Sequence, residues 1–105
     1  MNQLSSDPVE RVLQIISGRW KMAILQRLLD GPKRQSELMR LIPEVSQKVL
    51  LQQLRQLEEH GMVDRLVVAV VPPNVEYSLT EIAKALEPIA DAICDWGQKH
   101  AQFGD

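Results

Sequence analysis

The most informative segment of the chain is Ser46-Gln-Lys-Val-Leu-Leu-Gln-Gln-Leu-Arg-Gln-Leu-Glu-Glu-His-Gly61. Ser46 is suited to cap the start of a helix, and Gly61 is suited to end it. At about 100° per residue, three leucines fall on one side and predict a buried apolar stripe. These leucines are Leu50, Leu54 and Leu57. The segment is therefore predicted to be an amphipathic helix.

The opposite side of this helix is polar, with Leu51 on its flank. A polar helix side is usually only solvated, and that interpretation stays open for the helix alone. The two acids, Glu58 and Glu59, lie at the far end from the first turn. Gln suits adenine, and Lys or Arg suits guanine or phosphate, so the order favours a first turn that meets base edges. The polar candidates are Ser46, Gln47, Lys48, Gln52 and Arg55.

A shorter helix is predicted just before this one. Ser36 is expected to cap it, and it should run to about Ile42, where Pro43 breaks it. Two helices joined by about three residues match a helix-turn-helix. Lys33 and Arg34, ahead of the shorter helix, are placed to hold phosphates.

The segment after Gly61 is rich in β-branched residues and predicts two antiparallel strands, over residues 62–71 and 75–79. This order of helices and ribbon predicts a winged helix-turn-helix, a mainly α fold with a small antiparallel β-wing. Arg65, at the base of the first strand, is placed to reach the DNA backbone. The run from Leu66 to Val71 is wholly apolar and would favour aggregation if exposed. Part of the ribbon is therefore expected to be covered, by the domain or by a partner subunit.

Further helices are predicted on both sides of this unit. Asp7 should cap a first helix that ends near Gly18, and a second should span residues 19–29. Thr80 should cap a final helix that reaches about residue 99, and Pro88 should kink or divide it. The length fits a single domain over residues 1–105.

The net charge of −2 argues at first against nucleic acid, but its distribution matters more. Residues 33–65 hold six cations and five anions, whereas residues 81–105 hold two cations and five anions. No apolar run approaches the roughly 18 residues of a membrane span. The single cysteine fits a reducing cytoplasm, and no signal-peptide layout is present, so we expect a cytoplasmic location.

The remaining candidates favour simpler roles. His60 and His100 have no companion ligands at metal spacing, and no nucleophile–base pair or phosphate loop supports an enzyme, so no cofactor is expected. Cys94 is predicted to be a half-buried residue without a sensor role, although a cross-link between subunits stays open. Trp20 and Trp96 suit core or interface positions. A small-molecule effector pocket could use them, but no polar group orients a ligand there.

With these residues in view, the chain resembles the HxlR-type family of bacterial winged-helix transcription regulators, which are related to the MarR group. The resemblance covers about residues 7–97. The matching stretches are Gly18-Arg-Trp-Lys21, Gly31-Pro-Lys-Arg34, Ser36-Glu-Leu38, Ser46-Gln-Lys48, Gln52-Gln-Leu-Arg55 and Pro72-Pro-Asn-Val-Glu-Tyr-Ser-Leu-Thr80.

The resemblance implies a cytoplasmic homodimer that binds double-stranded DNA through the helix that starts at Ser46. Its two copies would read half-sites roughly 34 Å apart. The residues expected to contact DNA are Lys33, Arg34, Ser36, Ser46, Gln47, Lys48, Leu51, Gln52, Arg55, Arg65 and Asn74. The first and last helices would form the dimer contact through Val9, Val12, Leu13, Ile89, Ile93 and Trp96.

Two departures from the family pattern bear on function. Many members carry a cysteine where this chain has Asp7, so thiol sensing at that position is not expected. Similar sequences often place a basic residue after Pro72-Pro73, where this chain has Asn74. The uncharged wing tip favours the main alternative, a winged-helix module that binds protein. Salt-sensitive DNA affinity would separate the two.

Overall fold

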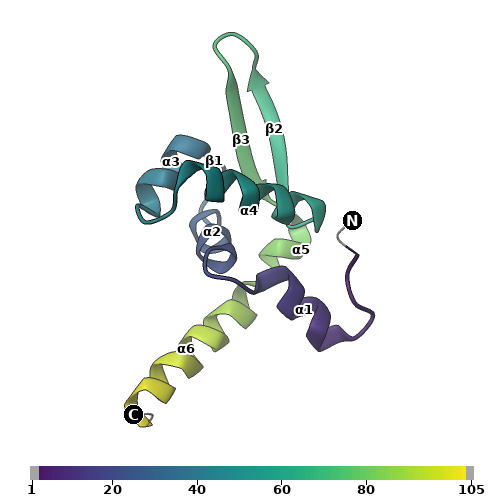
Figure 1. Cartoon of the computed structure of the whole chain (residues 1–105), viewed down its shortest axis with the longest axis vertical. Helices are drawn as coiled ribbons and strands as arrows, with labels where there is room; N and C mark the ends of the chain where they lie inside the picture. Colours follow the sequence, from purple (N-terminus) through teal and green to yellow (C-terminus); the bar gives the residue numbers. More distant parts are fainter. Residues whose placement is uncertain (1–2, 104–105) are drawn as a thin grey trace.

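The computed structural model describes residues 3–103, and it is mainly helical with a small antiparallel sheet (Figure 1). The predicted fold class is therefore confirmed. Along the chain the elements are α1 (Pro8–Ile16), α2 (Lys21–Arg27), β1 (Lys33–Arg34), α3 (Gln35–Leu41), α4 (Gln47–Glu59), β2 (Val63–Ala69), β3 (Asn74–Leu79), α5 (Glu81–Lys84) and α6 (Glu87–Phe103).

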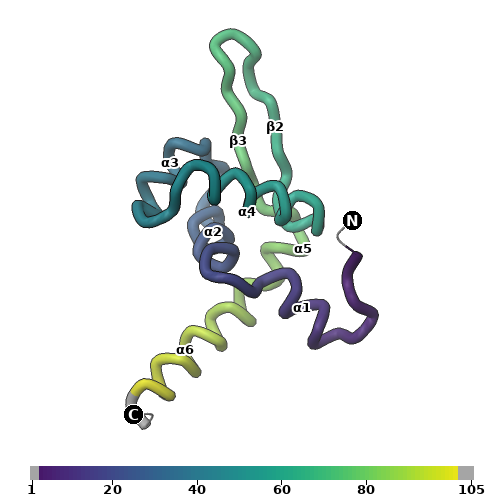
Figure 2. Tube along the Cα trace, in the orientation of Figure 1, coloured from purple at the N-terminus to yellow at the C-terminus, as the bar shows by residue number. Residues whose placement is uncertain are grey.

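The sheet has three strands in the order β1-β3-β2, all antiparallel. The long hairpin of β2 and β3 extends away from the helices as the wing (Figure 2). An irregularity in register lies between Val67 and Ala69. Strand β1, which pairs Lys33 with Tyr77, was not predicted because two residues show no alternation.

The core lies where α2, α3 and α4 meet the base of the wing. The predicted stripe of α4 is fully buried, with Leu54 only 1% exposed. It packs in one cluster with Ile24, Leu28 and Leu38 from the two preceding helices. This packing fixes the rotation of α4 about its axis, so its polar side must face outward.

The helix starts show which capping predictions hold. Ser46 Oγ accepts from Val49 N at 3.2 Å, as expected. The prediction that Ser36 caps α3 is wrong, because α3 already begins at Gln35. Arg34 occupies the cap position, and its backbone N–H donates to Glu37 Oε1 at 2.9 Å. The acid three residues on therefore fixes this helix start.

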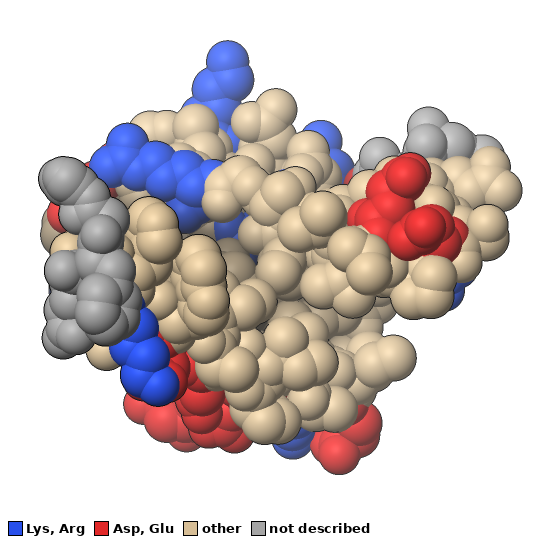
Figure 3. All heavy atoms as spheres, turned by 90° about the horizontal axis from the view of Figure 1, so that it is seen from below, with Lys and Arg blue, Asp and Glu red and all other residues tan. Residues whose placement is uncertain are grey.

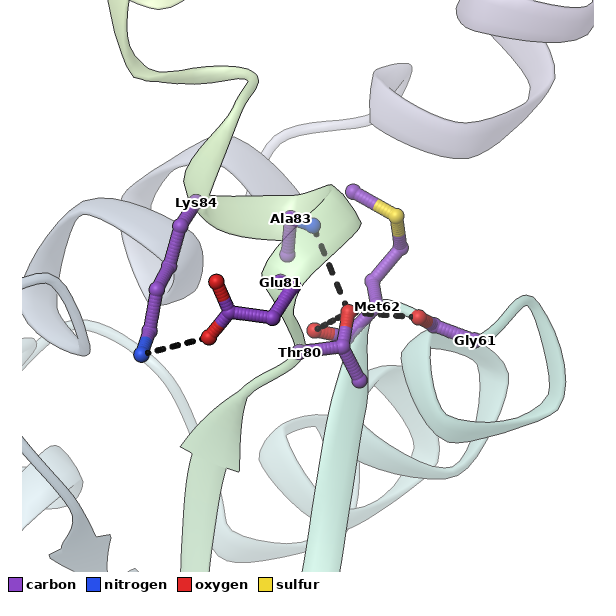
Figure 4. Close-up of polar contacts among 6 residues, drawn as sticks. All are labelled: Gly61, Met62, Thr80, Glu81, Ala83 and Lys84. Atoms are coloured by element: carbon purple, nitrogen blue, oxygen red, sulfur yellow. Dashed lines mark hydrogen bonds and ion pairs between the residues drawn. The ribbon is translucent and has the colours of Figure 1, made fainter.

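The region after the wing is divided at the predicted place. Thr80 Oγ1 accepts from Ala83 N at 3.3 Å and starts α5 (Figure 4). Helix α6 begins at Glu87, which puts Pro88 in its first turn, where a missing N–H costs little. The second predicted helix is shorter than expected, because α2 spans only Lys21–Arg27.

The domain covers the base of the ribbon but not its apolar run. Met62 and Val63 are buried, whereas Leu66 is exposed and Val71 is 88% exposed. The expectation of cover by the domain is therefore wrong for this run. Cys94, predicted to be half-buried, is also exposed, because nothing described in the chain packs over that side of α6. Among the helices of residues 3–103, none has the length and hydrophobicity needed to cross a bilayer.

Candidate nucleic-acid interface

The outward side of α4 presents a compact polar surface. Lys48, Gln52 and Arg55 are exposed and, with the half-buried Leu51, line a shallow hollow of about 290 Å³. These residues recur at three- and four-residue spacing, so they share one helix face once the leucine stripe is buried. The hollow combines two cations, an amide and an apolar flank, groups that can meet phosphates, base edges and a thymine methyl.

The first turn of α4 completes this surface. Ser46, Gln47 and Lys48 are all exposed, and Ser46 uses its hydroxyl on the cap. The buried Ile42 and Val45 anchor the turn before it, with Val45 N donating to Ile42 O at 3.1 Å. A helix of 13 residues has a partial positive charge at its N-terminus, which adds to the field of Lys48.

A second hollow, of about 530 Å³, lies between the helix-turn-helix and the wing. It brings together five predicted residues from five elements. They are Arg34, Ser36, Leu51, Arg65 and Asn74. We call this second hollow the cleft. Leu51 lines both hollows, so the cleft and the α4 face form one continuous surface. We call this the α4–wing surface.

The cleft also includes side chains that the sequence reasoning missed. Gln35 and Met39 of α3 line it beside Tyr77 of β3. Gln35 Nε2 donates to Met39 Sδ at 3.9 Å, a one-turn contact within α3. Asn74 Oδ1 is buried and has no hydrogen-bond partner within residues 3–103. It offers an acceptor to a ligand in the cleft.

Lys33 is placed differently from the other predicted cations. Its Nζ lies 2.5 Å from Asp30 Oδ1 and also donates to Gly31 O at 3.3 Å. Its side chain is only 16% exposed. The hydrogen bond and charge of Lys33 hold the pKa of Asp30 below its usual value. The ion pair offsets the field of Lys33, so Arg34 and Arg65 are the freer phosphate donors at this edge.

Lys21, which the sequence reasoning did not select, supports α4 from behind. It is a buried lysine of α2, and burial lowers its pKa. Its Nζ donates to Gln53 Oε1 at 2.9 Å and to Gln56 Oε1 at 2.7 Å. These bonds tie the inner polar flank of α4 to α2. They help to set the angle at which the outer side is presented.

The residues predicted for a dimer contact are largely uncovered. Val9 and Leu13 of α1 are exposed, as are Ile89, Ile93 and Trp96 of α6, whereas Val12 is half-buried. The three α6 residues line an apolar hollow with Pro88 and Ala92. Seen from below, the molecule shows a broad surface without Lys, Arg, Asp or Glu, and the charged residues lie mainly around its edge (Figure 3).

Comparison with known proteins gives this surface a family context. The family model described as HxlR-like helix-turn-helix matches residues 15–104. The uncharacterized HTH-type transcriptional regulator YtcD of Bacillus subtilis is 50% identical over 99 residues, which cover 92% of this chain and 79% of that protein. YkvN of the same organism, with the same description, is 48% identical over 85% of this chain and 75% of its own length.

Solved structures agree with the sequence relatives. The reduced form of the redox regulator HypR matches with a TM-score of 0.84 at 44% identity, over 90% of this chain and 94% of that one. The reduced form of the transcriptional regulator YodB from B. subtilis also gives 0.84, at 33% identity, over 97% of this chain and all of that one (100%). These proteins are regulators rather than enzymes. The chain therefore belongs to the HxlR-like helix-turn-helix family and is a transcriptional regulator.

Proposed function

We propose that the chain acts in the cytoplasm as a homodimer whose two α4 helices enter successive major grooves of a pseudo-palindromic operator. The observation that carries this proposal is the continuity of the α4–wing surface. It gathers Lys48, Gln52 and Arg55 with the cleft cations Arg34 and Arg65. Phosphate contacts would come from both parts, and base contacts from the first turns of α4.

The dimer is supported by the apolar surface of the outer helices. Ile89, Ile93 and Trp96 follow one side of α6 and remain exposed in the single chain. A contiguous apolar surface of this kind is typical of a protein interface. A two-fold axis through α6 would use the same patch twice, as expected for a C2 dimer.

The proposal is tested by removing the two cations of α4. The double variant Lys48→Ala, Arg55→Ala should lose at least about 100-fold in affinity for a palindromic operator chosen from random DNA. Fluorescence polarisation measures the affinity, and sedimentation should show an unchanged oligomeric state. The matched control, Lys84→Ala with Lys99→Ala, removes the same charge outside the α4–wing surface and should lose little. Equal losses in both double variants would contradict the proposal.

A protein-binding module is the second candidate, and the exposed apolar run from Leu66 to Val71 favours it. Salt dependence separates the two functions. DNA binding should weaken steeply as salt rises, because phosphate contacts release counterions. DNA affinity that is weak and insensitive to salt would favour the protein-binding module.

A further inference from the structure

The outer edge of the wing has no partner strand within residues 3–103. The sheet order is β1-β3-β2, so β3 pairs with one side of β2 and leaves its other side open. Residues 66–71, in this strand and the turn after it, carry no charge and no proline. Natural proteins usually protect such an edge with a lysine, a proline or a covering loop. The unprotected edge is therefore a place where another β-strand can add.

The side chain of Leu66 points away from the cleft. Arg65 lines the cleft, and successive residues of a strand face opposite sides of the sheet. Leu66 therefore lies on the outer face of the wing, where it is 61% exposed. The same face carries two acids, Asp64 of β2 and Glu76 of β3, which is the cross-strand partner of Leu66. Acids would repel the phosphates of DNA, so this face suits a protein partner.

A second copy of the same strand fits this edge. Two β2 edges can pair antiparallel across a two-fold axis, where residue i faces j and j faces i. The exposed and regularly paired part of β2 is residues 64–67, because Val63 is buried and the register is irregular after Val67. A pair centred on Arg65 would oppose two arginines, which is unfavourable.

Centring the pair on Leu66 avoids this repulsion. Leu66 then faces Leu66 of the second copy, and on both sides of it Arg65 faces Val67. One residue further along, Asp64 faces Val68. No like charges face each other, and the central contact covers two exposed leucines.

We propose that this edge joins neighbouring dimers on DNA, with β2 of one dimer paired to β2 of the next. Resting on the proposed function, this contact makes binding to adjacent operators cooperative. The wing and α6 lie at opposite ends of the molecule (Figure 1), so a dimer formed through α6 leaves both wings free and directed outward. A neighbouring dimer on the same DNA then meets this wing with its own.

The small size of the contact explains why DNA is needed. Strand β2 has seven residues, and a strand of that length is about 23 Å long. Two such edges bury far less than the roughly 1,200 Å² of a standard stable interface. Free dimers should therefore associate only weakly. Dimers on adjacent operators face each other at a high effective concentration, at which a weak contact contributes to binding.

Cooperativity is measured on a DNA fragment that carries two adjacent operators. In a quantitative footprinting titration, the wild type should occupy this fragment about tenfold more tightly than an isolated operator. Inserting about five base pairs, half a helical turn, should remove this gain, because it turns the two wings to opposite sides of the DNA. A series of spacings that gives no gain at any of them would overturn the proposal.

A charge swap at Leu66 identifies the partner as a second copy. Leu66→Lys and Leu66→Glu each oppose like charges across the two-fold axis, so each variant alone should lose the gain. An equal mixture of the two opposes lysine to glutamate and should recover most of it. Ile82→Lys and Ile82→Glu are the matched controls, because Ile82 of α5 is 70% exposed and lies outside the wing. A mixture that stays non-cooperative, or equal losses in the Ile82 variants, would overturn the proposal.

The gain is a ratio of two affinities, which separates the wing contact from other roles of the wing. A chain that binds an isolated operator as a dimer but shows no gain would keep the proposed function and overturn the wing contact. A Leu66→Lys variant that binds an isolated operator more tightly and stays cooperative would place this face on DNA instead.

A measurement without DNA tests the contact even if operator binding itself fails. The amide NMR resonances of Leu66 and Val67 should shift as the concentration of the full chain rises into the millimolar range. Leu66→Lys should abolish these shifts, whereas Ile82→Lys should leave them in place. Resonances of β2 that do not depend on concentration would overturn the proposal.

Discussion

Helices α4 and α6 are both long and amphipathic, but the apolar side of α4 is buried and that of α6 is exposed. In α4, Leu50, Leu54 and Leu57 are buried in the core, and the polar side faces out. In α6, Ile93 and Trp96 remain uncovered, the latter 67% exposed. Burial therefore leaves different sides of the two helices exposed. Helix α4 offers a polar surface that suits nucleic acid, and α6 offers an apolar surface that suits another protein.

The largest expected effect is a loss of stability at the centre of the buried leucine stripe of α4. Leu54→Ala should lower the free energy of unfolding by about 3 kcal/mol, because it leaves a cavity in a packed core. Urea denaturation measures this loss. Ile93→Ala, a truncation on the exposed stripe of α6, should cost the monomer less than about 1 kcal/mol. Similar losses at both positions would mean that the two apolar sides are equally buried.

The next effect concerns assembly rather than folding. Ile93→Asp with Trp96→Asp should dissociate the proposed dimer and weaken operator binding by about 100-fold, because each half-site would then be bound separately. Sedimentation velocity reports the dissociation, and circular dichroism should show an intact fold. Gln98→Asp places one acid on the far side of α6, about 180° from Ile89, and should leave the dimer intact. A dimer that survives the double change would remove α6 from the interface.

Only part of this contrast between the two helices could be predicted from the sequence. The 3.6-residue period identified the buried side of α4, and Pro88 identified the division before α6, because both signals are local. Strand β1 was not predicted, because it depends on pairing between Lys33 and Tyr77 rather than on its own two residues. The partners of Lys21 lie 32 and 35 positions away along the chain, so no local pattern could reveal that contact.

The candidate site shows the same limit. Spacing along α4 was enough to group Lys48, Gln52 and Arg55 on one face. The cleft was not predictable as a cleft, because it depends on how the hairpin stands relative to α3. For the same reason, Gln35 entered the site only with the structure in hand. The ion pair of Lys33, in contrast, could have been predicted, because Asp30 lies only three residues before it in the sequence.

The wing combines features of both helices, because it has an exposed apolar surface and lies beside the polar face of α4. Val71→Lys would place a cation on the exposed tip and should raise operator affinity about tenfold at low salt. Fluorescence polarisation over a salt series should show the slope steepen by about one counterion. Val71→Gln is the uncharged control and should leave the slope unchanged. An unaltered slope for the lysine variant would place the tip away from DNA.

Lys21 tests the buried support of α4. Lys21→Met should lower the free energy of unfolding by about 1 kcal/mol at pH 7, through loss of its bonds to Gln53 and Gln56. Burial lowers the pKa of Lys21 in the folded chain, so the unfolded chain holds this proton more tightly. Wild-type stability should therefore rise between the lowered folded pKa and the ordinary value of 10.5. The methionine variant lacks this rise, so its deficit should grow from pH 7 to pH 10 in urea titrations. A deficit that stays constant would contradict the assigned cause.

The smallest expected effect is at Cys94, which lies on α6 beside the apolar stripe and is exposed. The sequence contains one cysteine, so Cys94 has no second thiol with which to pair among these 105 residues. Cys94→Ser should leave operator affinity within about twofold, since surface changes away from a contact usually cost little. Diamide treatment of the wild type should likewise leave affinity unchanged in fluorescence polarisation. A disulfide-linked dimer on a non-reducing gel, formed together with a loss of affinity that Cys94→Ser prevents, would instead place the two α6 helices close together at this residue and give the thiol a regulatory role.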